Sequence, residues 1–213
     1  MDIEKEWSQR KQQFFKLWPP QNSDKINKIW NTLTGKYSEE TRFYHTRKHI
    51  IKCPQQFKQI ENLLTSGDAV QLSIWFHDAI YKTGAIDNEE QSAEYFSQVA
   101  RGLLPKEFIN RVAKLIVSTK HLSAPPNCDE AFLLDIDLSS FGSDWKTFNL
   151  DGENLRRENP QLSELEFNNN NINFFQMLLK REKIYFTDYF YAKYESEARK
   201  NINRQLQIIL PSR

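Results

Sequence analysis

Residues 70–81 read VQLSIWFHDAIY, and this stretch decides the fold. Apolar side chains occupy nearly every position up to Phe76, which is typical of a helix buried on all sides in the centre of a helical bundle. His77 and Asp78 interrupt that pattern with two polar side chains. Because an unpaired buried carboxylate is costly, we expect Asp78 to contact a metal ion or a basic side chain. A hydrogen-bonded core histidine beside an aspartate paired with Arg or Lys is the alternative that this stretch leaves open.

The sequence on both sides repeats apolar residues at helical spacing. A first helix carrying Trp7 and Phe14 is predicted to end at Pro19-Pro20, and a second to begin at a cap formed by Ser23 or Asp24. Further helices are predicted over residues 46–64, 70–81, 88–104 and 106–119, in a short segment that ends near 142, and from 145 onward, interrupted at Pro160 and at the polar run 168–171. The polar run indicates a loop or a helix edge.

Composition limits the fold class. The chain has 213 residues with 6 Gly and 8 Pro, whereas average usage gives roughly 25 of the two together. The turns that many short strands require are therefore scarce, which excludes an all-β sandwich or barrel. We predict an all-α fold in a single domain over residues 1–213, with a core over 24–145 and a helical extension over 146–213.

Charge and cysteine content narrow the function classes. The 29 basic and 28 acidic residues give a net charge of +1, so nothing global indicates binding to nucleic acid or to a membrane. The N-terminus lacks the apolar stretch of a signal peptide, and no run of about 18 apolar residues occurs. Cys53 and Cys128 form no CxxC motif, which favours a reducing compartment. We expect a cytoplasmic protein.

All four histidines lie in segments of interest. His45 and His49 are four residues apart in YHTRKHI, so they share one face if a helix has begun at His45. The His77–Asp78 pair follows, and His121 comes later in STKH. Two aspartates, Asp135 and Asp137, then occur in LLDIDLSSFG. On one helix these two point about 200° apart, so only one of them can face a common site.

This order resembles the HD superfamily of metal-dependent phosphohydrolases, in which a histidine, an adjacent His-Asp pair and a distant aspartate lie on different helices of an α-bundle. The resemblance covers residues 42–206 and is carried by RFYHTRKHI, WFHDAIY, DNEEQSA, STKH, LLDIDLSSFG, LRREN, KREKIYFT and EARKNINRQL. It implies an HD-domain-like bundle with His49, His77, Asp78 and Asp137 as metal ligands. Asp135 is the alternative for the last ligand.

The implied donor set is two imidazoles and two carboxylates, which suits Mn, Fe, Co, Ni or Zn better than Mg. Four ligands on an octahedral ion leave two positions for water and substrate. Binuclear members of the superfamily usually contain further histidines, so four in the chain favour one ion.

Other residues beside the motifs are candidates for catalysis or substrate binding. Asp78 and Glu89 are the expected catalytic carboxylates, and His45 and His121 are expected to contact substrate, the ligands or a second ion; helix-start or surface positions are the alternatives. One nucleotidase group of the superfamily places this glutamate three residues after the HD aspartate, where this chain has Tyr81. Cations beside the motifs are candidate phosphate contacts: Lys82, Lys120, Arg42, Arg47 and Arg156.

The resemblance implies hydrolysis of a phosphate ester or anhydride of a small molecule, with nucleotides among the candidates, by a metal-activated water. Two alternatives remain open. One is a regulatory domain that binds metal and metabolite without turnover, and the other is an oxygenase with a di-iron centre. No partner macromolecule is predicted, and the choice between a monomer and a homodimer is open.

Overall fold

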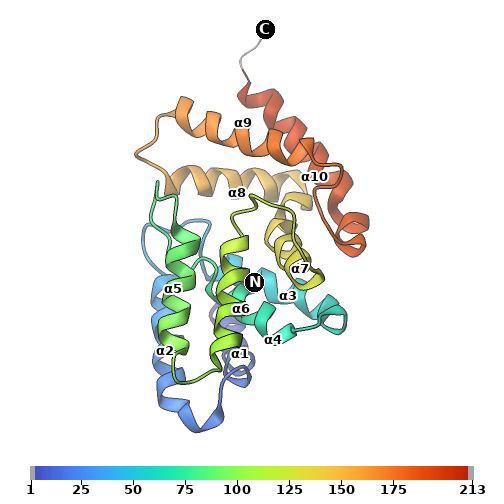
Figure 1. Cartoon of the computed structure of the whole chain (residues 1–213). Helices are drawn as coiled ribbons and strands as arrows, with labels where there is room; N and C mark the ends of the chain where they lie inside the picture. The colour runs from blue at the N-terminus through green and yellow to red at the C-terminus, as the bar shows by residue number, and fades with distance from the viewer. Residues whose placement is uncertain (1–2, 211–213) are drawn as a thin grey trace. The chain divides into compact units, whose positions relative to one another are not determined.

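Helices dominate residues 3–210, which are the residues that the computed structural model describes (Figure 1). This part of the chain contains no β-strand. The α-helices are α1 (Ile3–Lys16), α2 (Ser23–Lys36), α3 (Arg47–Ile60), α4 (Gly67–Phe76), α5 (Asn88–Ala100), α6 (Lys106–Ser118), α7 (Cys128–Asp137), α8 (Trp145–Glu158), α9 (Glu164–Lys180) and α10 (Asp188–Ile209). Three 3-10 helices are η1 (Pro20–Asn22), η2 (Glu61–Leu63) and η3 (Leu138–Gly142). The all-α prediction is confirmed.

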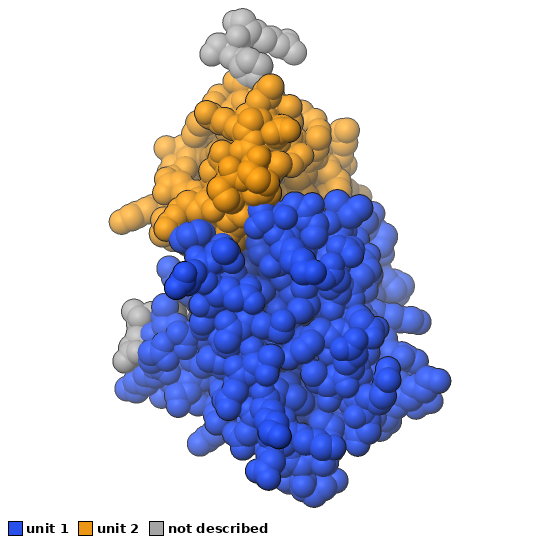
Figure 2. All heavy atoms as spheres, turned by 90° about the vertical axis from the view of Figure 1, so that its left-hand side faces the viewer, with its two compact units in different colours: residues 1–133 blue, residues 134–213 orange. Residues whose placement is uncertain are grey.

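The chain forms two compact units (Figure 2). Unit 1 extends to Leu133 and unit 2 begins at Leu134, so the division falls inside α7. The single domain with a core over 24–145 and an extension over 146–213 stays a prediction.

The core of unit 1 is built around α4. Trp75 and Phe76 are fully buried, and the ring of Trp75 lies 5.6 Å from Trp7, 5.6 Å from Trp30 and 5.8 Å from Phe14. Such aromatic pairs contribute about 0.5–1.5 kcal/mol each beyond their buried area. α6 packs against both α4 and α5, and α5 and α6 lie side by side (Figure 1). The prediction that the helix before His77, now α4, is buried in the centre of its bundle is confirmed.

The predicted end of α4 is wrong, because the helix stops at Phe76 and not at Tyr81. Residues 77–80 form a turn, here called the HDAI turn. Carbonyls at the end of a helix need donors from elsewhere. The Tyr37 hydroxyl donates to the Trp75 carbonyl at 2.9 Å, and Arg42 donates to the carbonyls of Asp78 and Ala79. These side chains replace the amides of a further helical turn.

Three other sequence predictions need correction. α5 ends at Ala100 instead of residue 104, because Gly102 has a φ of 76° and the amides of residues 103 and 104 both donate to the Ala100 carbonyl. The polar run 168–171 lies inside α9, since a capping box between Ser163 and Glu166 starts that helix upstream. Neither Ser23 nor Asp24 caps α2, which begins at Ser23 without a side-chain cap.

Unit 2 contains α8, α9, α10 and η3. Phe175, Tyr185 and Phe190 are buried in it. The buried Glu195 carboxylate accepts from the amides of Ile184 and Tyr185 and pairs with Arg199 at 2.6 Å, which fixes the segment before α10. None of the helices in residues 3–210 combines the length and apolarity needed to span a membrane.

Candidate metal centre

Two segments of unit 1 bring three predicted ligands together. His49 lies in the first turn of α3, and His77 and Asp78 open the HDAI turn after α4. The two imidazoles are buried, and the carboxylate is largely buried. Among the described residues, these three form a group whose ligand atoms all lie within 4.8 Å of one another.

The distances within this group suit a single ion. His77 Nε2 lies 3.0 Å from Asp78 Oδ2 and 3.3 Å from His49 Nε2, and His49 Nε2 lies 3.5 Å from Asp78 Oδ2. Ligands about 2.1 Å from an ion, at angles of roughly 90–109°, are about 3.0–3.4 Å apart. Two of the three distances fall in this range and the third, 3.5 Å, exceeds it by about 0.1 Å, so the three atoms have close to the spacing of neighbouring ligands of one ion.

A hydrogen bond fixes the tautomer of His77. Its Nδ1 lies 2.9 Å from the Ile74 carbonyl oxygen, and because a carbonyl only accepts, Nδ1 carries a proton. When His77 is neutral, the lone pair of its Nε2 points at two other potential acceptors, on His49 and Asp78. Such an arrangement is favourable only with a proton or a cation among the three atoms, and an N–H···O=C bond of this kind is the usual outer support of a metal-bound histidine.

The charge environment favours an ionised Asp78. In the ion-free protein, burial alone raises the pKa of this carboxyl, but protonated His77, and then protonated His45, together with a hydrogen bond from protonated His77, hold the pKa well below its ordinary value. A carboxylate with lowered pKa is available as a ligand at neutral pH.

His45 does not share the helical face of His49, because α3 begins only at Arg47. Its ring stacks on Tyr81, with centroids 4.0 Å apart and an interplanar angle of 27°. Tyr44 lies against both rings, 4.9 Å from His45 and 4.9 Å from His49. The rings of Tyr44, His45 and Tyr81 are partly exposed and lie beside the cluster. A role of His45 in catalysis stays a prediction.

His121 lies in the connection between α6 and α7, where its φ of 58° is the only positive value of a described non-glycine residue. It is buried, and it is not one of the three clustered residues. Its catalytic role stays a prediction.

The two aspartates of α7 differ in their surroundings. Asp135 is 1% exposed. Its Oδ1 accepts from the Phe186 amide at 2.8 Å, and its Oδ2 accepts from the amide and hydroxyl of Thr187 at 2.8 and 2.7 Å. Asp137, the last residue of α7, is partly exposed. Both aspartates belong to unit 2, whereas His49, His77 and Asp78 belong to unit 1. Asp137 as the last ligand, with Asp135 as its alternative, therefore stays a prediction.

Glu89 lies in the first turn of α5, as expected. Burial raises the pKa of its carboxyl, and the charge of Asp78 raises it further, against the effects of its own backbone amide and of Lys120. A half-buried carboxyl within reach of the field of Asp78 fits a group that takes up and releases a proton.

Four of the five cations predicted to bind phosphate differ in the contacts that their side chains make within the protein. Arg47 pairs with Glu4 at 2.9 Å, and Lys120 donates to Glu90 at 2.7 Å and to the Ile86 carbonyl at 2.9 Å. Arg156, in unit 2, donates to the carbonyls of residues 159 and 162. Lys82 is exposed beside the HDAI turn, which leaves it the best placed of the four for a substrate.

One neighbour of the cluster is absent from the predicted site residues. The Sγ atom of Cys53 lies 4.0 Å from His49 Nε2. The signal was present, because Cys53 follows His49 by four residues and therefore lies one turn further along α3.

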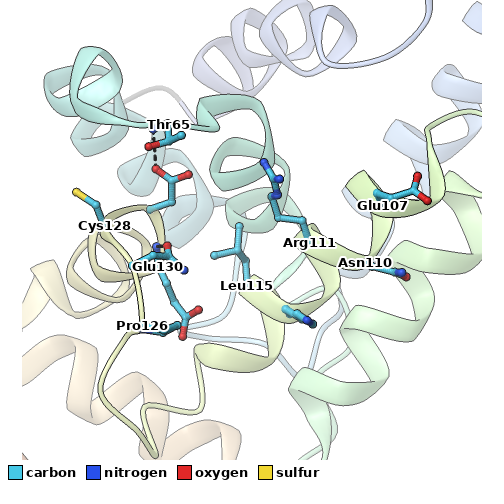
Figure 3. Close-up of a pocket in the computed structure, with 11 residues that line it drawn as sticks. Thr65, Glu107, Asn110, Arg111, Leu115, Pro126, Cys128 and Glu130 are labelled. Carbon is cyan, nitrogen blue, oxygen red and sulfur yellow. Dashed lines mark hydrogen bonds between the residues drawn. The ribbon is translucent and has the colours of Figure 1, made fainter.

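A separate groove of about 670 Å³ lies in unit 1 between α6 and the first residues of α7. Figure 3 shows Arg111 and Leu115 extending from α6 and Glu130 from α7. Both signs of charge line it, and its lining includes no residue of the metal cluster. The groove therefore indicates no particular ligand.

Removal of the metal is expected to lower the melting temperature. An ion that binds only the folded chain stabilises it by about 2.7 kcal/mol at a hundredfold excess over its Kd, which corresponds to roughly 5–10 °C for a chain of this size. Differential scanning calorimetry of protein stripped with chelator, and then reloaded with Mn or Ni, measures the shift. Equal melting temperatures for stripped and loaded samples, each verified by elemental analysis, would contradict this expectation.

No family model matches the chain, and comparisons with curated proteins and with solved structures find no significant match. The resemblance to the HD superfamily therefore stays a prediction, and the geometry of the site carries the functional argument.

Proposed function

We propose that this protein is a metal-dependent phosphohydrolase whose ion is held by His49, His77, Asp78 and Asp137. The observation that carries the proposal is the convergence of two imidazoles and one carboxylate within 3.5 Å, with the tautomer of His77 fixed by the Ile74 carbonyl.

The donor set favours Mn, Fe, Co, Ni or Zn over Mg, because the imidazoles supply nitrogen ligands. Such an ion, when bound, lowers the pKa of a coordinated water and polarises a phosphoryl oxygen. The Ile74 carbonyl would orient His77 as a ligand, and Glu89 would take up and release a proton at its carboxylate.

The substrate class that we propose is a phosphate ester or anhydride of a small molecule, such as a nucleotide. The exposed Lys82 beside the HDAI turn supplies a cation for a phosphate. The rings of Tyr81 and His45 offer an apolar surface beside it. We place the reaction in the cytoplasm, where the free thiols of Cys53 and Cys128 stay reduced.

A screen of phosphorylated metabolites with the Mn, Co, Ni, Zn, Fe and Mg forms tests this function. The expected result is release of inorganic phosphate or pyrophosphate from at least one compound, dependent on added metal. Metal binding without turnover of any compound would contradict it and favour a regulatory domain. Two irons per chain with consumption of oxygen would favour an oxygenase instead.

Glu89→Gln is expected to retain the metal and to slow turnover by about 10²- to 10⁴-fold, because Glu89 is proposed to hold and transfer a proton at its carboxylate. Rates on a substrate found in the screen, with metal content measured on the same samples, test this. Glu94→Gln is the matched control, since Glu94 is an exposed acid on the same helix. A wild-type rate for Glu89→Gln would assign Glu89 to the start of α5 alone.

A further inference from the structure

Arg42 lies in the connection between α2 and α3, and its side chain is 1% exposed. Its Nη1 donates to the Asp78 carbonyl at 2.6 Å and to the His45 carbonyl at 3.2 Å. Its Nη2 donates to the Ala79 carbonyl at 3.1 Å. Its Nε donates to Glu39 at 2.9 Å. Four of the five guanidinium N–H donors therefore already have acceptors within the protein.

These contacts join the backbone of a proposed ligand to the segment that enters α3. Asp78 and Ala79 lie in the HDAI turn, and His45 lies four residues before His49. The guanidinium of Arg42 thus contacts backbone carbonyls both in the segment that leads into α3, the helix of His49, and in the HDAI turn. Its charge also lies at the carbonyl end of α4, where a cation is favourable.

Other contacts complete the support of this turn. The Tyr37 hydroxyl donates to the Trp75 carbonyl, and the Tyr37 ring lies 5.3 Å from the guanidinium carbon of Arg42. The backbone amide of Ile80, the last residue of the turn, donates to the Ser92 hydroxyl at 3.0 Å. The Ile80 carbonyl accepts from the same hydroxyl at 3.1 Å. The turn is therefore fixed at its start and its end by other groups, and Arg42 fixes its middle, where Asp78 lies.

We propose that Arg42 is a positioning residue of the metal site, which holds the HDAI turn so that Asp78 and His77 meet His49. We do not assign it as a phosphate contact, because four of its five donors are occupied by backbone carbonyls and Glu39 and its side chain is 1% exposed. The inference rests on the proposed function in that it requires the cluster to bind an ion. Arginine is required at this position, since the single ammonium of lysine cannot span three carbonyls and a carboxylate.

The test measures metal affinity in folded protein. Arg42→Met and Arg42→Lys are compared with the wild type by calorimetric titration with Mn²⁺ and by the visible absorption of Co²⁺ titrated into the stripped protein. Outer contacts of metal ligands are worth about 10- to 100-fold in affinity, and we expect a loss of that size in both variants, together with a changed Co²⁺ spectrum. The conservative Lys variant retains the charge and most of the volume, so it decides the matter if the Met variant does not fold.

The matched control is Arg199→Met. Arg199 also donates to backbone carbonyls, those of Arg181 and Glu182 at 2.9 Å each, and pairs with Glu195, but it contacts no proposed ligand. We expect it to lower thermal stability without a change in Mn²⁺ affinity or in the Co²⁺ spectrum. Wild-type affinity and spectrum in folded Arg42→Lys would overturn the role of Arg42, whereas absence of binding in the wild-type protein would overturn the proposed function itself.

Discussion

Asp78→Asn is expected to weaken Mn²⁺ binding by at least about 100-fold and to remove phosphohydrolase activity with it, since loss of a direct ligand costs no less than loss of an outer contact. The substitution keeps the size of the side chain but removes the negative charge that balances the ion. In the ion-free protein, protonated His77 and His45 lower the pKa of this carboxyl despite burial, which favours the ionised form that binds a cation. Calorimetric titration and elemental analysis of the purified variant measure the effect.

The control for this variant is Asp68→Asn. Asp68 is an exposed aspartate in the first turn of α4, so the same chemical change occurs at the other end of the same helix. It is expected to bind metal as the wild-type protein does, with a small loss of stability at the helix N-terminus. Equal metal affinity in Asp78→Asn and Asp68→Asn would show that Asp78 is not a ligand.

The two aspartates of α7 are expected to respond in opposite ways. Asp135→Ala removes a carboxylate that accepts from two amides and one hydroxyl at the start of α10. Hydrogen bonds to charged groups contribute about 1.5–3 kcal/mol each, so metal-free Asp135→Ala is expected to lose about 3 kcal/mol or more of unfolding free energy. Asp137→Asn is expected to weaken metal binding, because the resemblance to the HD superfamily implies Asp137 as a ligand.

Urea denaturation in the presence of chelator and Mn²⁺ titration of both variants separate these effects. Asp135→Ala should bind Mn²⁺ with wild-type affinity at temperatures where it is folded. A reversed pattern, with metal affinity lost in Asp135→Ala and kept in Asp137→Asn, would assign the last ligand to Asp135.

Much of the fold could be predicted from the sequence because its signals are local. The apolar run before His77 required a buried helix, and Pro19 and Pro20 required an end to α1. The end of α4 could not be predicted, because the side chains that donate to the carbonyls there are far away in the sequence. Arg42 is 36 residues from Asp78, and Tyr37 is 38 residues from Trp75. Without those partners, AIY continues the helical pattern.

The candidate site was predictable to a similar extent. The resemblance to the HD superfamily implies a shared ion for His49, His77 and Asp78, and the structure brings these three together. The role of Arg42 was hidden, because a basic residue beside a motif suggests a phosphate contact, whereas its acceptors are backbone carbonyls that carry no sequence signal. The partners of Asp135 were hidden for the same reason, since they are amides more than 50 residues downstream.

The central claim is that His49, His77 and Asp78 hold a divalent ion. Anomalous diffraction from crystals grown with Mn²⁺ tests it most directly. The account predicts one anomalous peak roughly 2.0–2.3 Å from the Nε2 atoms of both histidines and from an Asp78 carboxylate oxygen. An occupied Mn²⁺ position elsewhere, with His77 Nε2 donating a hydrogen bond to Asp78 in an ion-free cluster, would contradict it.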